Sequence, residues 1–294
     1  MKWGQAAVPA PIIRTTDNLQ INLMSSFIYV DNLSPFLIHT TIFGHIIGVR
    51  WYGLAYVLGL WVAYYAYRTA AKRGFLPGMD GEAIGQMMFA IVAGVICGGR
   101  LGFVLQHPAW LVSHPIFLIQ VWKGGMTSFG GLIGVILALM WTARKYHVNF
   151  WTLTDIAAFP AAFGLGVGRI ANFINGELVG KPTNGNWGVI FPRVDNLPRH
   201  PSQLYESVAH FLMLGLLLWL LHQYPKITHK WPGFFAALFL ILYGALRCFT
   251  DFYRVDSTYW WSFSTGQWAS LITSFAGLIL LFFLMSRKNN LNNA

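Results

Sequence analysis

Charged residues are scarce in this chain. They make up 10% of the 294 residues, with 20 Lys and Arg against 10 Asp and Glu, whereas soluble domains carry about 25%. Hydrophobic residues make up 55%, and the mean hydropathy is +0.51. This shortage of charge excludes an ordinary soluble domain and predicts a membrane protein. In a membrane protein, a net charge of +10 indicates contacts with anionic lipids and basic cytoplasmic loops. We therefore expect no nucleic-acid partner.

Cysteines are also few, and both lie in apolar runs. Cys97 and Cys248 offer neither a disulfide framework nor the spacing of metal ligands. We therefore expect no metal and no cofactor. Residues 1–26 lack a compact apolar stretch behind their positive charge, so a cleavable signal peptide is not expected.

Long apolar runs are abundant instead. A spanning helix needs about 20 mostly apolar residues. Seven such runs occur, at roughly 44–67, 83–105, 125–143, 152–175, 202–221, 233–253 and 267–286. The sequence therefore predicts an all-α polytopic membrane protein with seven transmembrane helices and no separate soluble domain. The longest segment between runs, about 176–201, predicts a small head on one side of the membrane.

Basic clusters predict the orientation of these helices. Compact groups stand at alternate ends of the runs: Arg68, Lys72 and Arg73; Arg144 and Lys145; Lys226 and Lys230; Arg287 and Lys288. Positive loops face the cytoplasm, so we expect the N-terminus and the 176–201 head outside. The C-terminus, with the tail 287–294, is then cytoplasmic. Residues 1–34 are expected to be an N-terminal extension that precedes a membrane domain at 35–286.

Arginines interrupt several of the apolar runs. An ionisable group at membrane depth costs about 3 kcal/mol on insertion scales and indicates function. Arg100 lies within "VICGGRLGFVL", and Arg169 and Asn172 share a helix face in "GRIANFINGELVGKPT". In "LILYGALRCFTDFYR", a 4-4-3 spacing lines up four polar side chains on one helical stripe: Tyr243, Arg247, Asp251 and Arg254.

Two interpretations of this stripe are open. Asp251 can simply neutralise its two arginine neighbours, while Arg169 extends to a lipid headgroup. Alternatively, because the arginines outnumber the nearby acids, they line a buried cavity that binds a phosphate group. Guanidinium groups bind phosphate bidentately and stay charged, and we favour this second interpretation.

The stretch "RHPSQLYE" at 199–206 supplies further polar groups at the start of a helix. His200, with an ordinary pKa near 6.5, is a candidate proton acceptor, and Glu206 is a candidate binding residue. The alternative is an ordinary helix cap. Glu177, which follows Gly176, either accepts an arginine, orients a substrate or is an ordinary loop acid.

Glycine pairs indicate close helix packing. Three G-x-x-x-G pairs occur, at Gly94/Gly98, Gly130/Gly134 and Gly164/Gly168, and such pairs let helices approach each other. The alternative is that "GGMTSFGG" at 124–131 leaves room for a headgroup or a peptide backbone.

The order of five stretches resembles one known family. With "RWYGLAY", "GGRLG", "GRIANFINGELVGKPT", "RHPSQLYE" and "YGALRCFTDFYR", the chain resembles the prolipoprotein diacylglyceryl transferases over about residues 35–286. Members are seven-helix proteins of the bacterial inner membrane. They move the diacylglyceryl group of phosphatidylglycerol to the lipobox cysteine thiol of a lipoprotein precursor and release glycerol phosphate. The resemblance thus implies phosphatidylglycerol, the precursor's signal peptide and the bilayer as partners.

The resemblance and the residue patterns together give a candidate site. The expected catalytic residues are Tyr52, Arg169, Asn172, Glu177, His200 and Arg247; those expected to bind substrate are Arg100, Gly180, Glu206, Tyr243 and Arg254. Tyr52, Gly180 and Glu177 are included because of the family's motifs, whereas His200 is a hypothesis from its position. Arg100 is expected to face a headgroup or to be structural.

This chain departs from the family pattern at three points. Phe129 stands where many members have a histidine that is often assigned a catalytic role. Asp251 replaces the usual glutamate, and no proline follows Arg254. Either that histidine is dispensable, or the thiol loses its proton to another group such as His200, Glu177 or Glu206, or the chain is a catalytically silent lipid-binding relative.

A transporter of an anion or a lipid is a further alternative. Such a conduit needs polar groups through the cytoplasmic half of the membrane. The inner halves of the runs at 202–221 and 267–286 carry almost no charge, so we favour the transferase.

Overall fold

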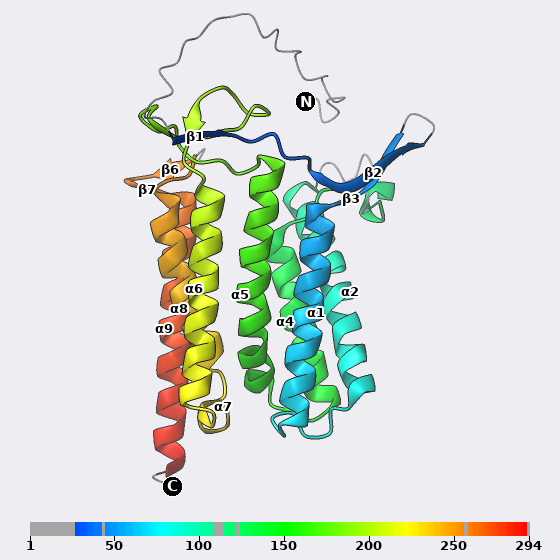
Figure 1. Cartoon of the computed structure of the whole chain (residues 1–294). Helices are drawn as coiled ribbons and strands as arrows, with labels where there is room; N and C mark the ends of the chain where they lie inside the picture. Colours follow the sequence, from blue (N-terminus) through cyan, green and yellow to red (C-terminus); the bar gives the residue numbers. More distant parts are fainter. Residues whose placement is uncertain (1–26, 43–44, 109–114, 121–123, 256–257, 293–294) are drawn as a thin grey trace, which may run out of the picture.

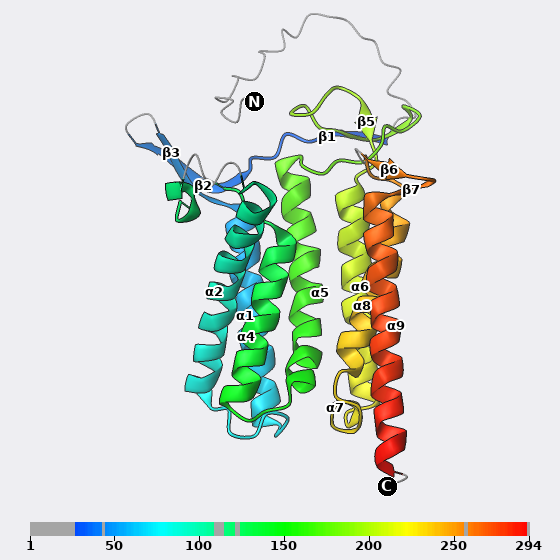
Figure 2. The same ribbon diagram turned by 180° about the vertical axis from the view of Figure 1, so that it is seen from behind.

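The structure of the chain is a computed structural model that describes residues 27–42, 45–108, 115–120, 124–255 and 258–292. Within these residues, helices of 18 or more residues run side by side in one bundle (Figure 1, and from behind in Figure 2). They are α1 (Trp51–Lys72), α2 (Gly81–Gln106), α4 (Ser128–Lys145), α5 (Phe150–Asn175), α6 (Ser202–Gln223), α8 (Phe234–Asp251) and α9 (Thr265–Asn292).

Five of these helices are long and apolar enough to cross a membrane, namely α2, α5, α6, α8 and α9. Their outer surfaces expose large apolar side chains such as Phe89, Leu105 and Phe282, each more than 70% accessible. Apolar surface on this scale is unfavourable in water and suits contact with lipid chains. The prediction of a multi-pass membrane protein is therefore confirmed, whereas the crossing by α1 and α4 stays a prediction.

The first predicted helix was placed too early. We expected a helix from about residue 44, but His45–Arg50 forms strand β3, which pairs antiparallel with β2 (Phe36–Ile42), and α1 begins at Trp51. A short apolar run is compatible with a strand or a helix, and hydropathy alone does not distinguish them. The presence of a partner strand decides the outcome here.

Short strands form a head at one end of the bundle (Figure 1). Besides β2 and β3 they are β1 (Phe27–Val30), β4 (Trp187–Ile190), β5 (Pro198–Arg199), β6 (Tyr259–Trp260) and β7 (Phe263–Ser264). The first sheet has the order β1-β4-β5, and β6 pairs with β7. The expected all-α class holds for the bundle, while the strands of the head were not predicted. The short helices η1 (Pro115–Leu118) and α7 (Ile227–Lys230) complete the described elements.

The last part of the predicted N-terminal extension belongs to this head. β1 pairs in parallel with β4, so residues 27–30 contact the 176–201 segment. The Arg193 guanidinium donates to the carbonyl oxygens of Ile174, at 3.2 Å, and Leu33. These bonds tie the segment before β2 to the end of α5. Residues 1–26 of the extension lie outside the described residues, and its boundary at 34 stays a prediction.

Glycines allow α2 and α4 to touch. A Cβ atom on Gly94 would overlap the carbonyl of Gly134, and one on Gly98 would overlap that of Gly130. Both predicted pairs therefore pack backbone against backbone, as expected of small residues in membrane helices. At the third pair, an added Cβ on Gly164 or Gly168 would meet no atom within 4 Å, so this pair lacks the backbone overlap of the other two; a Cβ on Gly59 of α1 would nevertheless lie 3.8 Å from the Gly164 Cα.

The position of α8 depends on a buried acid in α5. The Asp155 carboxylate is 1% exposed and accepts hydrogen bonds from the backbone N–H groups of Gly233 and Ala236, both at 2.9 Å. These groups lie at the beginning of α8, where helix N–H groups lack partners of their own. A carboxylate also suits the positive end of the helix dipole. α8 is thereby fixed beside α5, and the arginines of its last turns are brought to the head.

Candidate active site

Three arginines, from α5, from α8 and from the turn after α8, bind a single buried carboxylate. Glu206, in the second turn of α6, has a side chain that is 1% exposed. Its Oε2 lies 2.7 Å from Nε of Arg169 on α5, and its Oε1 lies 2.7 Å from Nη1 of Arg247 on α8. Nη1 of Arg254, just after α8, donates to the same Oε1 at 3.0 Å. The end of α5 is thus joined to the end of α8 through α6.

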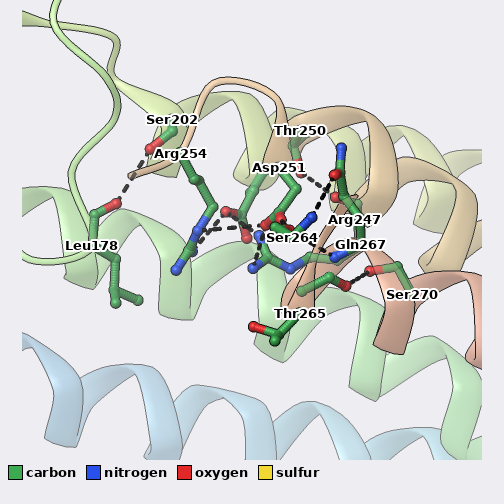
Figure 3. A network of polar contacts seen from close by, with 12 residues as sticks. Leu178, Ser202, Arg247, Thr250, Asp251, Arg254, Ser264, Thr265, Gln267 and Ser270 are labelled. Carbon is green, nitrogen blue, oxygen red and sulfur yellow. Dashed lines mark hydrogen bonds and ion pairs between the residues drawn. The ribbon is translucent and has the colours of Figure 1, made fainter. Parts of the chain in front are cut away.

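Asp251 holds two of these arginines from the other side (Figure 3). Its Oδ1 lies 2.9 Å from Nη2 of Arg247 and 3.8 Å from Nε of Arg254. Ser264 donates its hydroxyl to Oδ2 of the same carboxylate. Asp251 is 3% exposed and lies at the end of α8. The aspartate that stands here in place of the family's usual glutamate is therefore part of the network, and its side chain, shorter than that of glutamate, still reaches both guanidiniums.

The cluster of Arg169, Arg247, Arg254, Glu206 and Asp251 carries an excess of positive charge. Three guanidiniums face two carboxylates, and the arginine side chains are only 12–16% exposed. A buried charge is stable only when it is paired and hydrogen-bonded. The excess of one positive charge suits this cluster to an anion, and forked guanidiniums are especially suited to phosphate.

A second group of polar side chains adjoins this cluster. Tyr52, in the first turn of α1, donates its hydroxyl to Oε2 of Glu177 at 2.7 Å. Asn172 donates its amide nitrogen to the Tyr52 hydroxyl and, at 3.5 Å, to Glu177. Its amide oxygen accepts from Nη1 of Arg169 at 3.4 Å. The expected residues of α1, α5 and the following loop are therefore in contact, and Arg169 links them to the cluster.

The turn after α5 places Glu177. Gly176 ends the helix with φ +66°, a left-handed conformation that favours glycine. The Glu177 carbonyl then accepts from the side-chain nitrogen of Gln203 at 2.6 Å. The hydroxyl of Ser202 donates to the carbonyl of Leu178 at 3.2 Å (Figure 3). The beginning of α6 is thereby attached to the turn that carries the acid.

Gly180 lies where three segments meet. Its N–H donates to the His200 carbonyl at 3.1 Å, and it forms a bridge with Arg254. A Cβ atom at this position would overlap the backbone oxygens of His200 and Tyr253. Glycine is therefore required for the close approach of the backbones that position Arg254.

His200 lies apart from the arginine cluster. Its ring packs against the rings of Trp187, Tyr205 and Tyr253, and its Nδ1 is 3.2 Å from the Tyr205 hydroxyl. Burial lowers the pKa of His200 below its ordinary value, and the charge of Lys181 adds to this effect. Among the described residues, its contacts include no member of the cluster. Its predicted role as thiol base stays a prediction.

Arg100 is likewise separate from the other predicted residues. Its guanidinium donates to backbone carbonyls of Leu118, Gln120 and Gly125, at 3.2, 2.8 and 3.0 Å, and also to that of Gly124. The side chain is 2% exposed. These contacts support the structural alternative, in which Arg100 fixes the loop between α2 and α4, over substrate binding.

Sequence reasoning missed His210, a polar residue beside the cluster. The ring of Tyr243, a predicted residue of α8, packs at 5.8 Å from the ring of His210 on α6. His210 is 4% exposed and lies in the electrostatic neighbourhood of Arg169, Glu206 and Arg247. The available signal was its spacing of four residues from Glu206, which puts the two side chains on one helix face.

Phe129 lies on the surface of the bundle. It lies in the first turn of α4 and is 70% exposed. Among the described residues, no group of three or more His, Cys, Asp or Glu side chains is arranged to hold a metal ion. The polar chemistry of the described bundle is concentrated at the head ends of α5, α6 and α8.

The bundle and its buried arginines define a class: a multi-pass membrane protein with a buried arginine–carboxylate cluster just below its head. Comparison with known proteins is more specific. The family model described as prolipoprotein diacylglyceryl transferase matches residues 40–283. The chain belongs to this family, and the match includes each expected site residue.

Curated relatives agree with this assignment over most of their length. The phosphatidylglycerol–prolipoprotein diacylglyceryl transferase of Nitrosomonas europaea is 42% identical over 244 residues, covering 80% of this chain and 86% of that protein. Those of Nitrosospira multiformis and Bordetella avium are 42% and 40% identical, covering 80% and 83% of this chain and 82% and 93% of their own. The similarity is therefore not confined to one motif.

Proposed function

We propose that the chain transfers the diacylglyceryl group of phosphatidylglycerol to the lipobox cysteine of lipoprotein precursors, forming a thioether and releasing glycerol phosphate. The observation that carries the proposal is the convergence of Arg169 and Arg247, from two helices, on one buried carboxylate. The names of the curated relatives support the two substrates.

The cluster is suited to the charge that develops in this reaction. The thiolate attacks the glycerol carbon that bears the phosphate ester. The carbon–oxygen bond breaks, and negative charge accumulates on the departing phosphate. Fixed guanidiniums in a dry site stabilise that charge more than the ground state. Arg169 and Arg247 bind the phosphate, with Glu206 as the internal anion that orients them until substrate arrives.

The surrounding residues have supporting roles. Arg254, at the outer end of α8, binds the headgroup, and Asp251 sets its direction. Hydrogen bonds connect Tyr52, Asn172 and Glu177. Through Asn172 they fix the position of the Arg169 guanidinium and orient the substrate. Tyr243 orients the reacting groups from α8. Gly180 acts by letting the head approach Arg254.

The position of the head supports one orientation in the membrane. Basic residues Lys72, Arg144, Lys145 and Lys230 stand at the ends of α1, α4 and α7, opposite the strands in Figure 1. Under the positive-inside rule this end is cytoplasmic. All seven long helices, α1 and α4 included, cross the bacterial inner membrane, with the head and the N-terminus outside and the C-terminus in the cytoplasm.

Reconstitution tests the proposal directly. Purified protein in phosphatidylglycerol vesicles is mixed with a lipobox peptide, and mass spectrometry follows the thioether product and glycerol phosphate together. A peptide with serine in place of cysteine is the substrate control. We expect Arg169→Ala to abolish both products, while Arg144→Gln, at the far end of α4, leaves them unchanged. Lipid that is bound but never consumed would instead indicate a silent relative, and lipid translocation without product a transporter.

A further inference from the structure

A buried imidazole lies within the arginine cluster. His210 is 4% exposed, and the backbone of Glu206 lies close enough to interact with its ring, but among the described residues its Nδ1 makes no hydrogen bond of normal geometry. Polar atoms at such depth are nearly always paired, so an unpaired one requires an explanation. One explanation is that this nitrogen forms its hydrogen bond only when a substrate is bound.

The position of His210 is defined by three helices. It follows Glu206 by four residues on α6, which places it about 6 Å further into the bundle. Its ring faces Tyr243 of α8 at 5.8 Å. The charged groups that face it are Arg169 from α5, Glu206 from its own helix and Arg247 from α8. Every helix that supplies the phosphate-binding groups therefore also borders this imidazole.

The other candidates for the proton acceptor are already engaged elsewhere. Glu206 pairs with three guanidiniums, and Glu177 accepts from Tyr52 and Asn172. The His200 ring is enclosed by aromatic rings of the head. Among the described histidines, His210 alone borders the cluster.

We propose that His210 is the proton acceptor for the substrate thiol; this rests on the proposed transferase function. The thiol proton passes to the free ring nitrogen, and the sulfur lone pair forms the bond to the glycerol carbon. The carbon–oxygen bond breaks, and its electron pair leaves on the phosphate held by Arg169 and Arg247. The imidazolium formed in this step is stabilised by the Glu206 carboxylate and then returns its proton to the departing phosphate.

A variant without the ring tests the proposal. In His210→Gln, we expect kcat to fall about 10²- to 10⁴-fold, the usual contribution of general base catalysis, with KM for the lipid nearly unchanged. The matched control is His222→Gln, on the exposed last turn of the same helix. Thermal unfolding in detergent establishes that both variants fold.

A change of nucleophile separates proton transfer from packing. A selenol ionises far more readily than a thiol, so a lipobox peptide with selenocysteine needs little help from a base. We expect this peptide to restore most of the rate of His210→Gln. An equal defect with both peptides, or unchanged turnover of the cysteine peptide, would overturn the proposal.

The wild-type protein provides an independent measurement should the variant fail to fold. As the pH falls and the imidazole becomes protonated, the turnover rate of the wild-type protein should decrease with the cysteine peptide. The decrease should be much smaller with the selenocysteine peptide. Parallel profiles for the two peptides would contradict the role of His210. Failure of the transferase function itself would be recognised differently, because wild-type protein would then form no product with either peptide at any pH.

Discussion

Arg169 on α5 and Arg247 on α8 bind opposite oxygens of the Glu206 carboxylate, each at 2.7 Å. Two residues 78 positions apart in the sequence are therefore held together on one buried carboxylate, that of a third residue on α6. Had they pointed into separate parts of the bundle, the phosphate site inferred from the sequence would have had no physical basis.

Removing the charge of Glu206 should destabilise the protein and abolish turnover. Glu206→Gln leaves three guanidiniums buried with only Asp251 to balance them, and breaking a buried ion pair from one side costs about 3–5 kcal/mol. Thermal unfolding in detergent measures the loss of stability. Glu82→Gln, in the exposed first turn of α2, is the control. A variant as stable as wild type would show that the network contributes nothing to folding.

Arg247→Lys should not preserve activity, although it keeps the positive charge. Arg247 uses separate nitrogens for Glu206 and Asp251, and the compact ammonium of lysine lacks the fork that holds both acids. We expect the rate to fall about 100-fold, close to the effect of losing one preorganised donor. Steady-state kinetics on phosphatidylglycerol vesicles measure it. Full activity of the lysine variant would mean that charge alone is sufficient.

Tyr52→Phe should weaken the reaction without unfolding the protein. The hydroxyl accepts from Asn172 and donates to Glu177, and the substitution leaves both partially unpaired at a cost of about 1–3 kcal/mol. If this cost appears in the transition state, kcat falls about 5- to 150-fold. Tyr65, which is 60% exposed and lies about three and a half turns further along α1, provides the control: Tyr65→Phe should retain wild-type kinetics.

Gly180→Ala should disturb the head and displace Arg254. The added methyl group would collide with backbone oxygens of His200 and Tyr253, and neither atom lies on a flexible side chain. Limited proteolysis of the 176–201 segment should be faster, and turnover should fall. In Gly168→Ala the new methyl group meets no atom within 4 Å, so that variant should resist proteolysis as wild type does.

His200 should make the stability of the head depend on pH. Its pKa is lowered in the folded protein by burial, so the unfolded chain binds the proton more readily. The stability due to the neutral ring is then present above the unfolded pKa, near 6.5, and is lost as the pH falls through that value toward the folded pKa. Unfolding followed between about pH 8 and about pH 5 should show a smaller decline for His200→Gln than for wild type. Equal declines would contradict this prediction.

The sequence determined the membrane class, because seven apolar runs with little charge are incompatible with water, and it supplied the residues of the candidate site. The spacing of Arg247 and Asp251 sufficed to place them on one helical stripe, since helix geometry is local. The prediction was wrong for Arg254, which lies beyond the end of α8 in a β-bridge with Gly180. It did not separate β3 from α1, because the strand depends on its partner β2.

Only the tertiary structure decided which side chains meet. Which acid receives the three guanidiniums depends on how α5, α6 and α8 pack, and so does the burial of His210 beside them. The same packing left His200 among aromatic rings and directed Arg100 to loop carbonyls. The physical reason is that contacts between distant segments arise from the joint packing of whole helices, which local spacing does not specify.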